Sequence, residues 1–560
     1  MAEVSGLLLG AVSVLTSLKG TLDTALLIEF YLDDEKLNCS YLALRYHIQK
    51  TRLDLWRRVY NIDDISACPL RKQPEIVQRL VIQILGQINQ LFDESKRLVD
   101  KHNINTPVSP AANVDGTPRP QDAVIAALSK IRVKPKAKFL WTIKGKAEFE
   151  EKVSNINTLI DDLEGFTVNA SESQSLQRAL PSMGLKHITN TTMLHTLLEP
   201  NTRVDSALAT SARVKLLQSN FAKSPESSAT VLTIDQLRFL QNSSTLGTLR
   251  STAMSFTPVW IEWSVVSDGT AAPEYIRRIK ALGYLLEKAS DPVLRLPVCH
   301  GIFDDLAYEA EFGARRIGYV FSAPQAGHNS TSSLPVPAPL SLPTYGRNFR
   351  DHPPRTLSDL IKDKSFPVPL LGDRFTLAFT LATAFSYFHS AGWLHKGFHS
   401  GNIIFLAQDS GQEGAIRATD PFITGFQYSR PADSHSLSRG PLENSDLEHY
   451  YHPSAEKGFS RRIDLYSLGV VLCEIGRWGL VRSTVPDQAR RKMVDRVAWR
   501  NYLVRKVLAD IGWRMGEKYQ SAVRTLLECQ LPDDENGNSG EFFEQEYFEK
   551  VIRPLSACSA

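Results

Sequence analysis

The chain has 560 residues, of which 42% are hydrophobic and 22% charged, a composition typical of soluble globular proteins with two to four domains at this length. The formal net charge of +3 provides no whole-chain attraction to nucleic acid, and we expect no nucleic-acid partner. The six cysteines are scattered without a C-x-x-C pair, which excludes zinc-ligand spacing and a disulfide framework and favours a reducing compartment.

The N-terminal segment, residues 4–18, contains fifteen positions without a charge. It is shorter than the roughly twenty apolar residues needed to span a bilayer. Glu3 precedes it and no basic residue does, which argues against a signal peptide. Two interpretations stay open: a buried helix of a bundle, or a helix that is buried at rest and can move into a membrane. Gly6 and Gly10 form a G-x-x-x-G, which permits close helix packing in lipid.

Three stretches within residues 1–200 have helical character. Residues 76–99 carry apolar side chains at spacings of three and four, and residues 149–163 repeat the pattern. Residues 41–60 are rich in Leu and Arg and form a third candidate. These stretches predict an all-α helical bundle over residues 1–200.

A run of basic side chains lies between Asp122 and Glu148, with no acidic residue between those two positions. Such a run can contact anionic lipid headgroups, at about 1 kcal/mol per basic residue near the surface. It can equally bind nucleic-acid phosphate or form an ordinary solvated loop. The candidates for headgroup contact are Lys130, Arg132, Lys134, Lys136 and Lys138.

A polar stretch rich in Ser and Thr predicts a linker at residues 201–240, followed by a second domain at 241–560. In this domain His395 and Asn402 have the spacing of the protein kinase catalytic loop, H-R-D-L-x-x-x-N. In kinases the Asp accepts the substrate hydroxyl proton and the Asn holds Mg²⁺. The Asp position is Gly397, which has no side chain to accept a proton.

The segments around this loop resemble a protein kinase in their order. Residues 375–389 are an apolar stretch of helical length, and residues 403–406 read as a short apolar strand. Residues 461–475 resemble the kinase segment D-x-W-S-x-G-x-x-L-x-E, in which Asp464 would brace the catalytic loop and Gly469 would belong to the buried helix. The resemblance implies a bilobal α+β protein kinase-like fold.

The remaining catalytic parts of a kinase are degenerate. The D-F-G that binds magnesium is matched by Gly425, Phe426 and Gln427. Gly247 alone represents the glycine-rich loop, and the lysine that pairs with phosphate is expected at Ser264 or a neighbour. Loss of the base, the metal ligand and the lysine together removes most of the electrostatic stabilisation of phosphotransfer.

We therefore expect a pseudokinase without a catalytic residue, a metal or a required cofactor. Asp420 is a weaker candidate for a displaced metal ligand, since an Asp-Pro pair more often forms a turn. Asn402 is a weak candidate for cofactor binding, so binding of ATP without catalysis stays open.

The N-terminal region resembles the HeLo domain, the prion-inhibition and propagation domain of fungal heterokaryon-incompatibility proteins. The resemblance rests on the start at residues 3–10, on Leu42, Leu44, Arg45, Arg52 and Trp56, and on residues 139–163. It implies a role in regulated cell death, in which the N-terminal helix is released and enters a membrane. The inserting residues would be Leu7, Leu8, Leu9, Val12 and Val14.

The combined pattern predicts a fungal cell-death or incompatibility effector, cytoplasmic at rest and membrane-associated on activation. A helical bundle would act at an anionic membrane under the control of an inactive kinase-like domain. An upstream signalling protein would bind that domain, and the active form is compatible with a homo-oligomer. Two alternatives are a divergent active kinase that binds ATP and a signalling scaffold without membrane activity.

Overall fold

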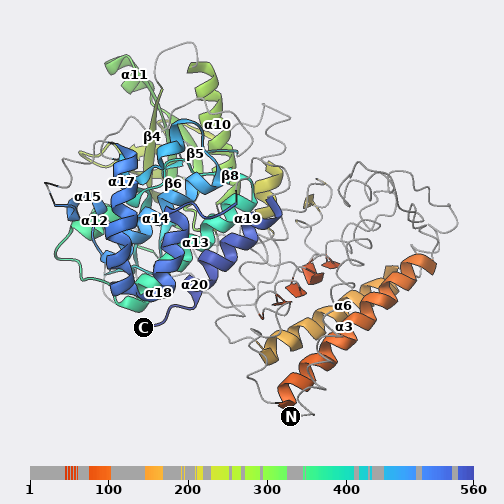
Figure 1. Cartoon of the computed structure of the whole chain (residues 1–560). Coiled ribbons are helices and arrows are strands. Elements are labelled where there is room, and N and C mark those ends of the chain that lie inside the picture. The colour runs from red at the N-terminus through yellow and green to blue at the C-terminus, as the bar shows by residue number, and fades with distance from the viewer. Residues whose placement is uncertain are drawn as a thin grey trace, which may run out of the picture. The chain divides into compact units, whose positions relative to one another are not determined.

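The computed structural model divides the chain into two compact units, Met1–Leu176 and Gln177–Ala560 (Figure 1). The residues that it describes are parts of 45–60 and of 191–217, together with 75–101, 146–167, 229–250, 255–266, 272–290, 294–324, 345–408 except 347, 415–426, 429–431, 447–488 except 487, 495–532 and 540–560.

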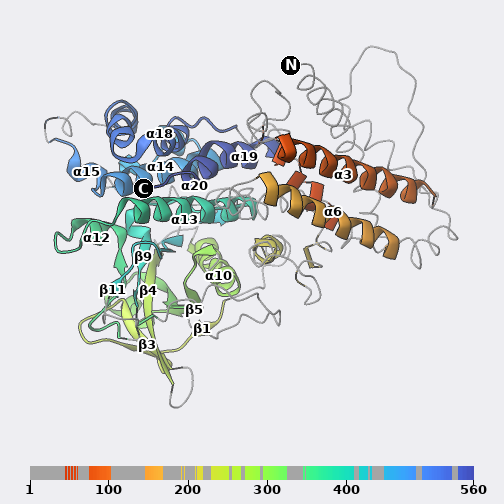
Figure 2. The ribbon, with the colours of Figure 1, turned by 90° about the horizontal axis from the view of Figure 1, so that it is seen from below.

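Two long helices dominate the described part of the first unit, α3 (Glu75–Lys101) and α6 (Lys146–Thr167). They pack against each other along one apolar face of each helix (Figure 2). The buried side chains recur at spacings of three and four, as an amphipathic helix requires. They are Val81, Ile84, Leu85, Ile88, Phe92 and Leu98 on α3, and Phe149, Val153, Ile156, Ile160 and Leu163 on α6. The helices predicted at 76–99 and 149–163 are thus confirmed.

The described residues between 45 and 60 are also helical and pack on this pair. Tyr46 is buried between Phe92 and Phe149, with ring centroids 5.3 and 5.6 Å away. The Arg52 guanidinium pairs with the Asp161 carboxylate at 2.6 Å. A buried guanidinium is tolerated only when it is paired, so this contact helps to fix the segment on α6.

The second unit contains a six-stranded sheet in the order β1-β5-β6-β4-β3-β2, in which all neighbours are antiparallel except β1 and β5. Helix α10 (Ala272–Ala289) joins β4 to β5 and packs on both strands. The strands are β1 (Val231–Leu232), β2 (Leu237–Phe239), β3 (Leu246–Arg250), β4 (Phe256–Val266), β5 (Val298–Asp304) and β6 (Arg315–Ser322).

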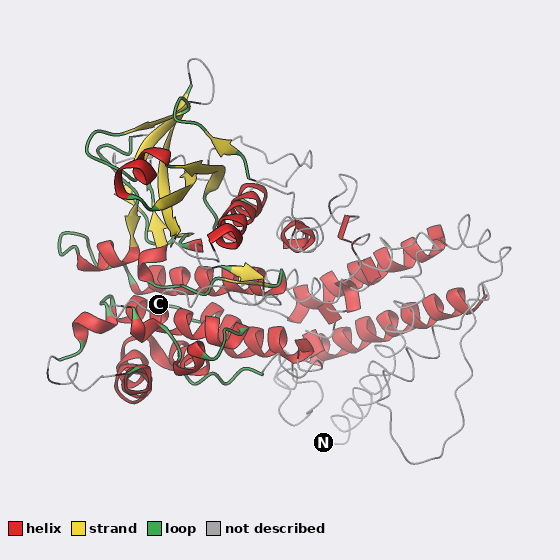
Figure 3. Ribbon diagram, turned by 90° about the horizontal axis from the view of Figure 1, so that it is seen from above, coloured by secondary structure: helices red, strands yellow, loops and turns green. Residues whose placement is uncertain are grey.

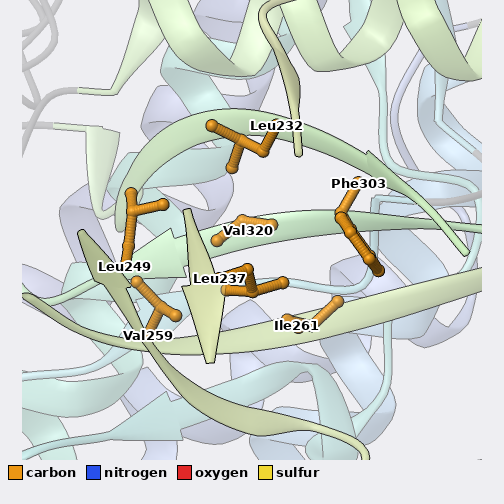
Figure 4. Close-up of a cluster of buried hydrophobic side chains, with 7 residues drawn as sticks. All are labelled: Leu232, Leu237, Leu249, Val259, Ile261, Phe303 and Val320. Atoms are coloured by element: carbon orange, nitrogen blue, oxygen red, sulfur yellow. The ribbon is translucent and has the colours of Figure 1, made fainter. Parts of the chain in front are cut away.

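The inner face of this sheet encloses a small apolar core (Figure 4). Its side chains come from all six strands and point toward one another; they are Leu232, Leu237, Leu249, Val259, Ile261, Phe303 and Val320. The predicted linker at 201–240 therefore needs correction, because β1 and β2 lie within it. Each of these short strands has one buried leucine, Leu232 or Leu237, and exposed neighbours. Their surroundings are polar on average, which is why the sequence resembled a linker.

Beyond the sheet and the helices that pack on it, the unit is mainly helical, and Figure 3 shows the yellow strands of the sheet grouped together with red helices beside them. Helices α13 (Leu371–Ser390) and α14 (Arg461–Arg477) pack against each other; α14 is almost wholly buried, and α13 is buried from Leu381 to its end. The helices predicted at 375–389 and 461–475 are confirmed. Further helices are α11 (Leu306–Phe312), α12 (Leu357–Lys362), α15 (Val481–Thr484), α17 (Arg496–Tyr502), α18 (Leu508–Leu527), α19 (Gly540–Tyr547) and α20 (Arg553–Ser556).

Short strands connect α13 to α14. Strand β9 (Ile403–Phe405) lies between β12 (Phe422–Ile423) and β7 (Arg355–Thr356), which confirms the strand predicted at 403–406. The 3-10 turn η5 (Ser400–Asn402) precedes β9 directly. Two more strand pairs flank this group: β8 (Trp393–Leu394) with β13 (Arg430–Pro431), and β10 (Ala407–Gln408) with β11 (Ala415–Ile416).

Candidate functional site

The loop between β8 and η5 is held by one buried carboxylate, Asp464, near the start of α14. It accepts the backbone N–H of His395 at 2.9 Å and that of Lys396 at 2.8 Å, and it contacts Nε2 of His389 at 3.1 Å. Burial alone would raise the pKa of Asp464, but its hydrogen bonds with His389 and the His395 backbone lower that pKa below its usual value. Asp464 therefore fixes the course of the loop as a carboxylate.

His395 is a buried link between this loop and β12. Its Nε2 lies 2.8 Å from the Thr424 carbonyl oxygen, so the hydrogen-bonded tautomer carries the proton on Nε2. Burial lowers the pKa of His395, which keeps the ring neutral. The centroid of this ring lies 4.9 Å from that of Phe426, whose centroid lies 5.8 Å from that of Phe388 on α13. His395 and Phe426 thus belong to an apolar cluster that packs the loop between β8 and η5 against the segment after β12.

Asn402 and Gly425 are packed directly on each other. Asn402 accepts the His399 N–H through its side-chain oxygen at 3.1 Å and the Thr424 N–H through its backbone oxygen at 2.8 Å. Gly425 has a φ of +78°, and a Cβ built there would lie 1.9 Å from Nδ2 of Asn402. No carboxylate can occupy position 425 unless Asn402 moves.

The other predicted positions of the loop differ in what surrounds them. Gly397 lies in a buried bend directly after Lys396, whose φ is +66°. Gly469 faces α18, where an added Cβ would lie 2.8 Å from Cβ of Leu526, so its missing side chain allows α14 and α18 to approach closely. Gln427 lies outside the described residues.

A carboxyl from the sheet reaches the Gly425 backbone. The Gly425 N–H donates to Oε2 of Glu262 on β4 at 2.9 Å. Burial raises the pKa of Glu262, while the hydrogen bond from Gly425 opposes that effect. The expected position, Ser264, is buried two residues further along the strand and does not line the cavity described next. Glu262, which the sequence prediction missed, takes the place facing the loop.

Glu262, Asn402 and Gly425 share the wall of a cavity of about 350 Å³. The lining comes from the sheet on one side and from η5, β7, β9 and the segment after β12 on the other. Among the described residues, Glu262 is the single charged side chain in this lining, and none is basic. The remaining lining residues are Thr245, Leu246, Trp260, Ile261, Trp263, Pro354, Thr356, Gly401, Ile404 and Thr424.

Two residues that the sequence analysis singled out near this cavity have structural contacts of their own. Asp420 pairs with the Arg295 guanidinium at 2.8 Å and accepts the Tyr345 hydroxyl, and it does not line the cavity. It is therefore a structural partner of Arg295. Gly247 lies within β3, where an added Cβ would be 2.6 Å from the Arg238 carbonyl oxygen, so it allows a close approach of two strands. The loop from β2 to β3, residues 240–245, contains no glycine.

A second buried carboxyl lies behind the loop and was not predicted. Glu474 on α14 accepts the Tyr450 hydroxyl at 2.8 Å and the Val481 N–H at 3.0 Å, and Ser400 lies 2.8 Å from the same hydroxyl. Burial raises the pKa of Glu474 to about 7. The sequence signal was the final E of the segment D-x-W-S-x-G-x-x-L-x-E, which falls on Glu474 and to which no role was assigned.

The residues predicted to act at membranes lie outside the described part of the chain. These are the inserting residues Leu7, Leu8, Leu9, Val12 and Val14 and the headgroup residues Lys130, Arg132, Lys134, Lys136 and Lys138. Within the described ranges, no helix combines the length and apolar character needed to cross a bilayer. The same ranges contain no group of His, Cys, Asp and Glu side chains that could hold a metal ion.

Comparison with protein families gives two matches. Residues 6–197 match the HeLo domain of prion inhibition and propagation. The HeLo resemblance predicted from the sequence is thus confirmed, and this domain suggests a fungal cell-death or incompatibility-type function. Residues 330–558 match a domain of unknown function, DUF7580; the match includes the loop, α13 and α14 and begins after β6, the last strand of the six-stranded sheet in the sequence. No curated protein matches the chain.

Proposed function

We propose that this protein is a cell-death or incompatibility effector whose HeLo domain acts at anionic membranes under the control of a kinase-like unit that does not transfer phosphate. The HeLo match over residues 6–197 supports the first half of the proposal. Partner binding at the second unit would shift an equilibrium between a form with the N-terminal segment buried and a form with that segment released.

The topology of the second unit supports the kinase-like assignment. Leaving β1 aside, the sheet has five antiparallel strands, with α10 inserted between β4 and β5. A mainly helical part follows, in which Asp464 on a buried helix holds the backbone of a loop ending in Asn402. Kinases carry their catalytic Asp and metal-binding Asn on a loop of this spacing.

The hydrogen bond between Glu262 and Gly425 is the main observation that supports the proposed absence of phosphate transfer. The sequence V-W-I-E at 259–262 then corresponds to the kinase V-A-I-K, with a carboxylate in place of the lysine that pairs with phosphate. Gly425 occupies the metal-ligand position, and Asn402 fills the space that an aspartate side chain at position 425 would need. In its ionised form Glu262 repels phosphate oxygens, so the cavity then disfavours the ligand that phosphotransfer requires.

Dye release from anionic liposomes tests the membrane half of the proposal. We expect release by residues 1–200 and little release by the full chain, because the second unit would restrain the first. Leu8→Lys should abolish release, since it places a charge in the inserting segment, whereas Leu8→Ile should preserve it. Circular dichroism must show that each protein is folded. A folded fragment that neither binds lipid nor releases dye would support the scaffold alternative.

Nucleotide binding and phosphate incorporation test the kinase half. We expect neither tight binding of Mg·ATP nor incorporation of labelled phosphate by the full chain. Tight Mg·ATP binding that is lost in Asn402→Ala would instead support a divergent active kinase.

A further inference from the structure

The cavity around Glu262 has the features of a small-molecule site with an unusual charge. Its volume of about 350 Å³ falls near the lower end of the range for ligand pockets. Apolar residues line it from both sides: Leu246 and Trp260 from the sheet, and Pro354 and Ile404 from the opposite wall. Apolar walls of this kind can take up an apolar group such as an aromatic ring.

The polar part of the cavity favours a ligand that donates hydrogen bonds. Glu262 accepts the Gly425 N–H at 2.9 Å and also has the Thr424 and Trp260 side chains as partners, so only part of the roughly four acceptor sites of a carboxylate is left for a ligand. The other polar lining groups, from Asn402 and three threonines, are uncharged. Among the described residues, no basic side chain lines the cavity or acts on the charge of Glu262.

We propose that this cavity binds a small aromatic cation, with the ring between the apolar walls and the charged nitrogen group held by the Glu262 carboxylate. An amidinium or guanidinium matches a carboxylate with two parallel N–H···O bonds, which are stronger than hydrogen bonds between neutral groups. A ligand with phosphate groups is disfavoured by the same charge. This inference goes beyond the membrane effector role and does not depend on it.

Benzamidine and benzamide are a matched pair of probes for the full-length protein. They have nearly the same shape, but only benzamidine is positively charged. Isothermal titration calorimetry should show that benzamidine binds at least about tenfold more tightly than benzamide, the expected effect of one charge-assisted pair. Mg·ATP should bind more weakly than benzamidine.

Two variants locate the effect. Glu262→Gln keeps the shape and an acceptor for the Gly425 N–H but removes the charge, so it should abolish the preference for benzamidine. Asp235→Asn removes an exposed acid elsewhere in the same unit and should leave both affinities unchanged. A thermal melt must show that each variant is folded.

Three outcomes would overturn the proposal. The first is equal binding, or no binding, of the two probes by the wild-type protein, a comparison that needs no variant. The second is a preference for benzamidine that persists in a folded Glu262→Gln protein. The third is Mg·ATP binding that is tighter than that of benzamidine.

Discussion

Replacing Asp464 by Ala should destabilise the second unit severely and loosen the loop that contains His395. The Asp464 side chain is fully buried and accepts backbone N–H groups of His395 and Lys396 at 2.9 and 2.8 Å, besides its contact with His389. Each buried donor left without a partner costs about 1–3 kcal/mol. Two backbone donors therefore give about 2–6 kcal/mol, a large part of the roughly 5–15 kcal/mol that stabilises a typical domain.

Urea unfolding of the full chain and hydrogen exchange of the peptide 393–402 measure this effect globally and locally. We expect a lower midpoint for the transition of the second unit and faster exchange of the His395 and Lys396 amides. Asp351→Ala is the matched control, because Asp351 is exposed and bonded only to nearby Asn348; its effect should stay within about 0.5 kcal/mol. If Asp464→Ala lowers the free energy of unfolding by less than about 1 kcal/mol and leaves amide exchange unchanged, the role assigned to Asp464 is refuted.

Two further substitutions test the packing of the loop and the buried acid behind it. Gly425→Ala should lower the melting temperature more than Gly313→Ala, because both glycines have positive φ but only position 425 places a Cβ against Asn402; equal losses would contradict this packing. Glu474 has a folded pKa of about 7 and an ordinary value of 4.5, so the folded state binds the extra proton and the wild type should lose stability as pH rises from 4.5 to 7. Glu474→Gln should remove that dependence, and above pH 7 its free energy of unfolding, measured in urea, should exceed that of the wild type by about 3 kcal/mol at most. Parallel profiles of unfolding free energy against pH for the two proteins would disprove the shifted pKa.

Helical periodicity and motif spacing were enough to predict several of the main helices and the position of the loop. The apolar faces of α3 and α6 were visible because three- and four-residue spacings report directly on a helix surface. The interval from His395 to Asn402 located the loop for a similar reason, since both residues belong to one short segment. By contrast, β1 and β2 are short edge strands with one buried Leu each, and their polar composition resembled a linker.

The sequence by itself determined which residue types are present: glycines at 397 and 425, an acid at 464 and a HeLo-like helical region before them. Only the tertiary structure decided which side chain meets which. Strand β4 could be aligned with Ser264 or with Glu262 facing the loop, because the two lie on the same face of the strand. The hydrogen bond from Gly425, more than 160 residues away in the chain, settled that choice. Contacts between distant segments depend on packing, which local spacing does not encode.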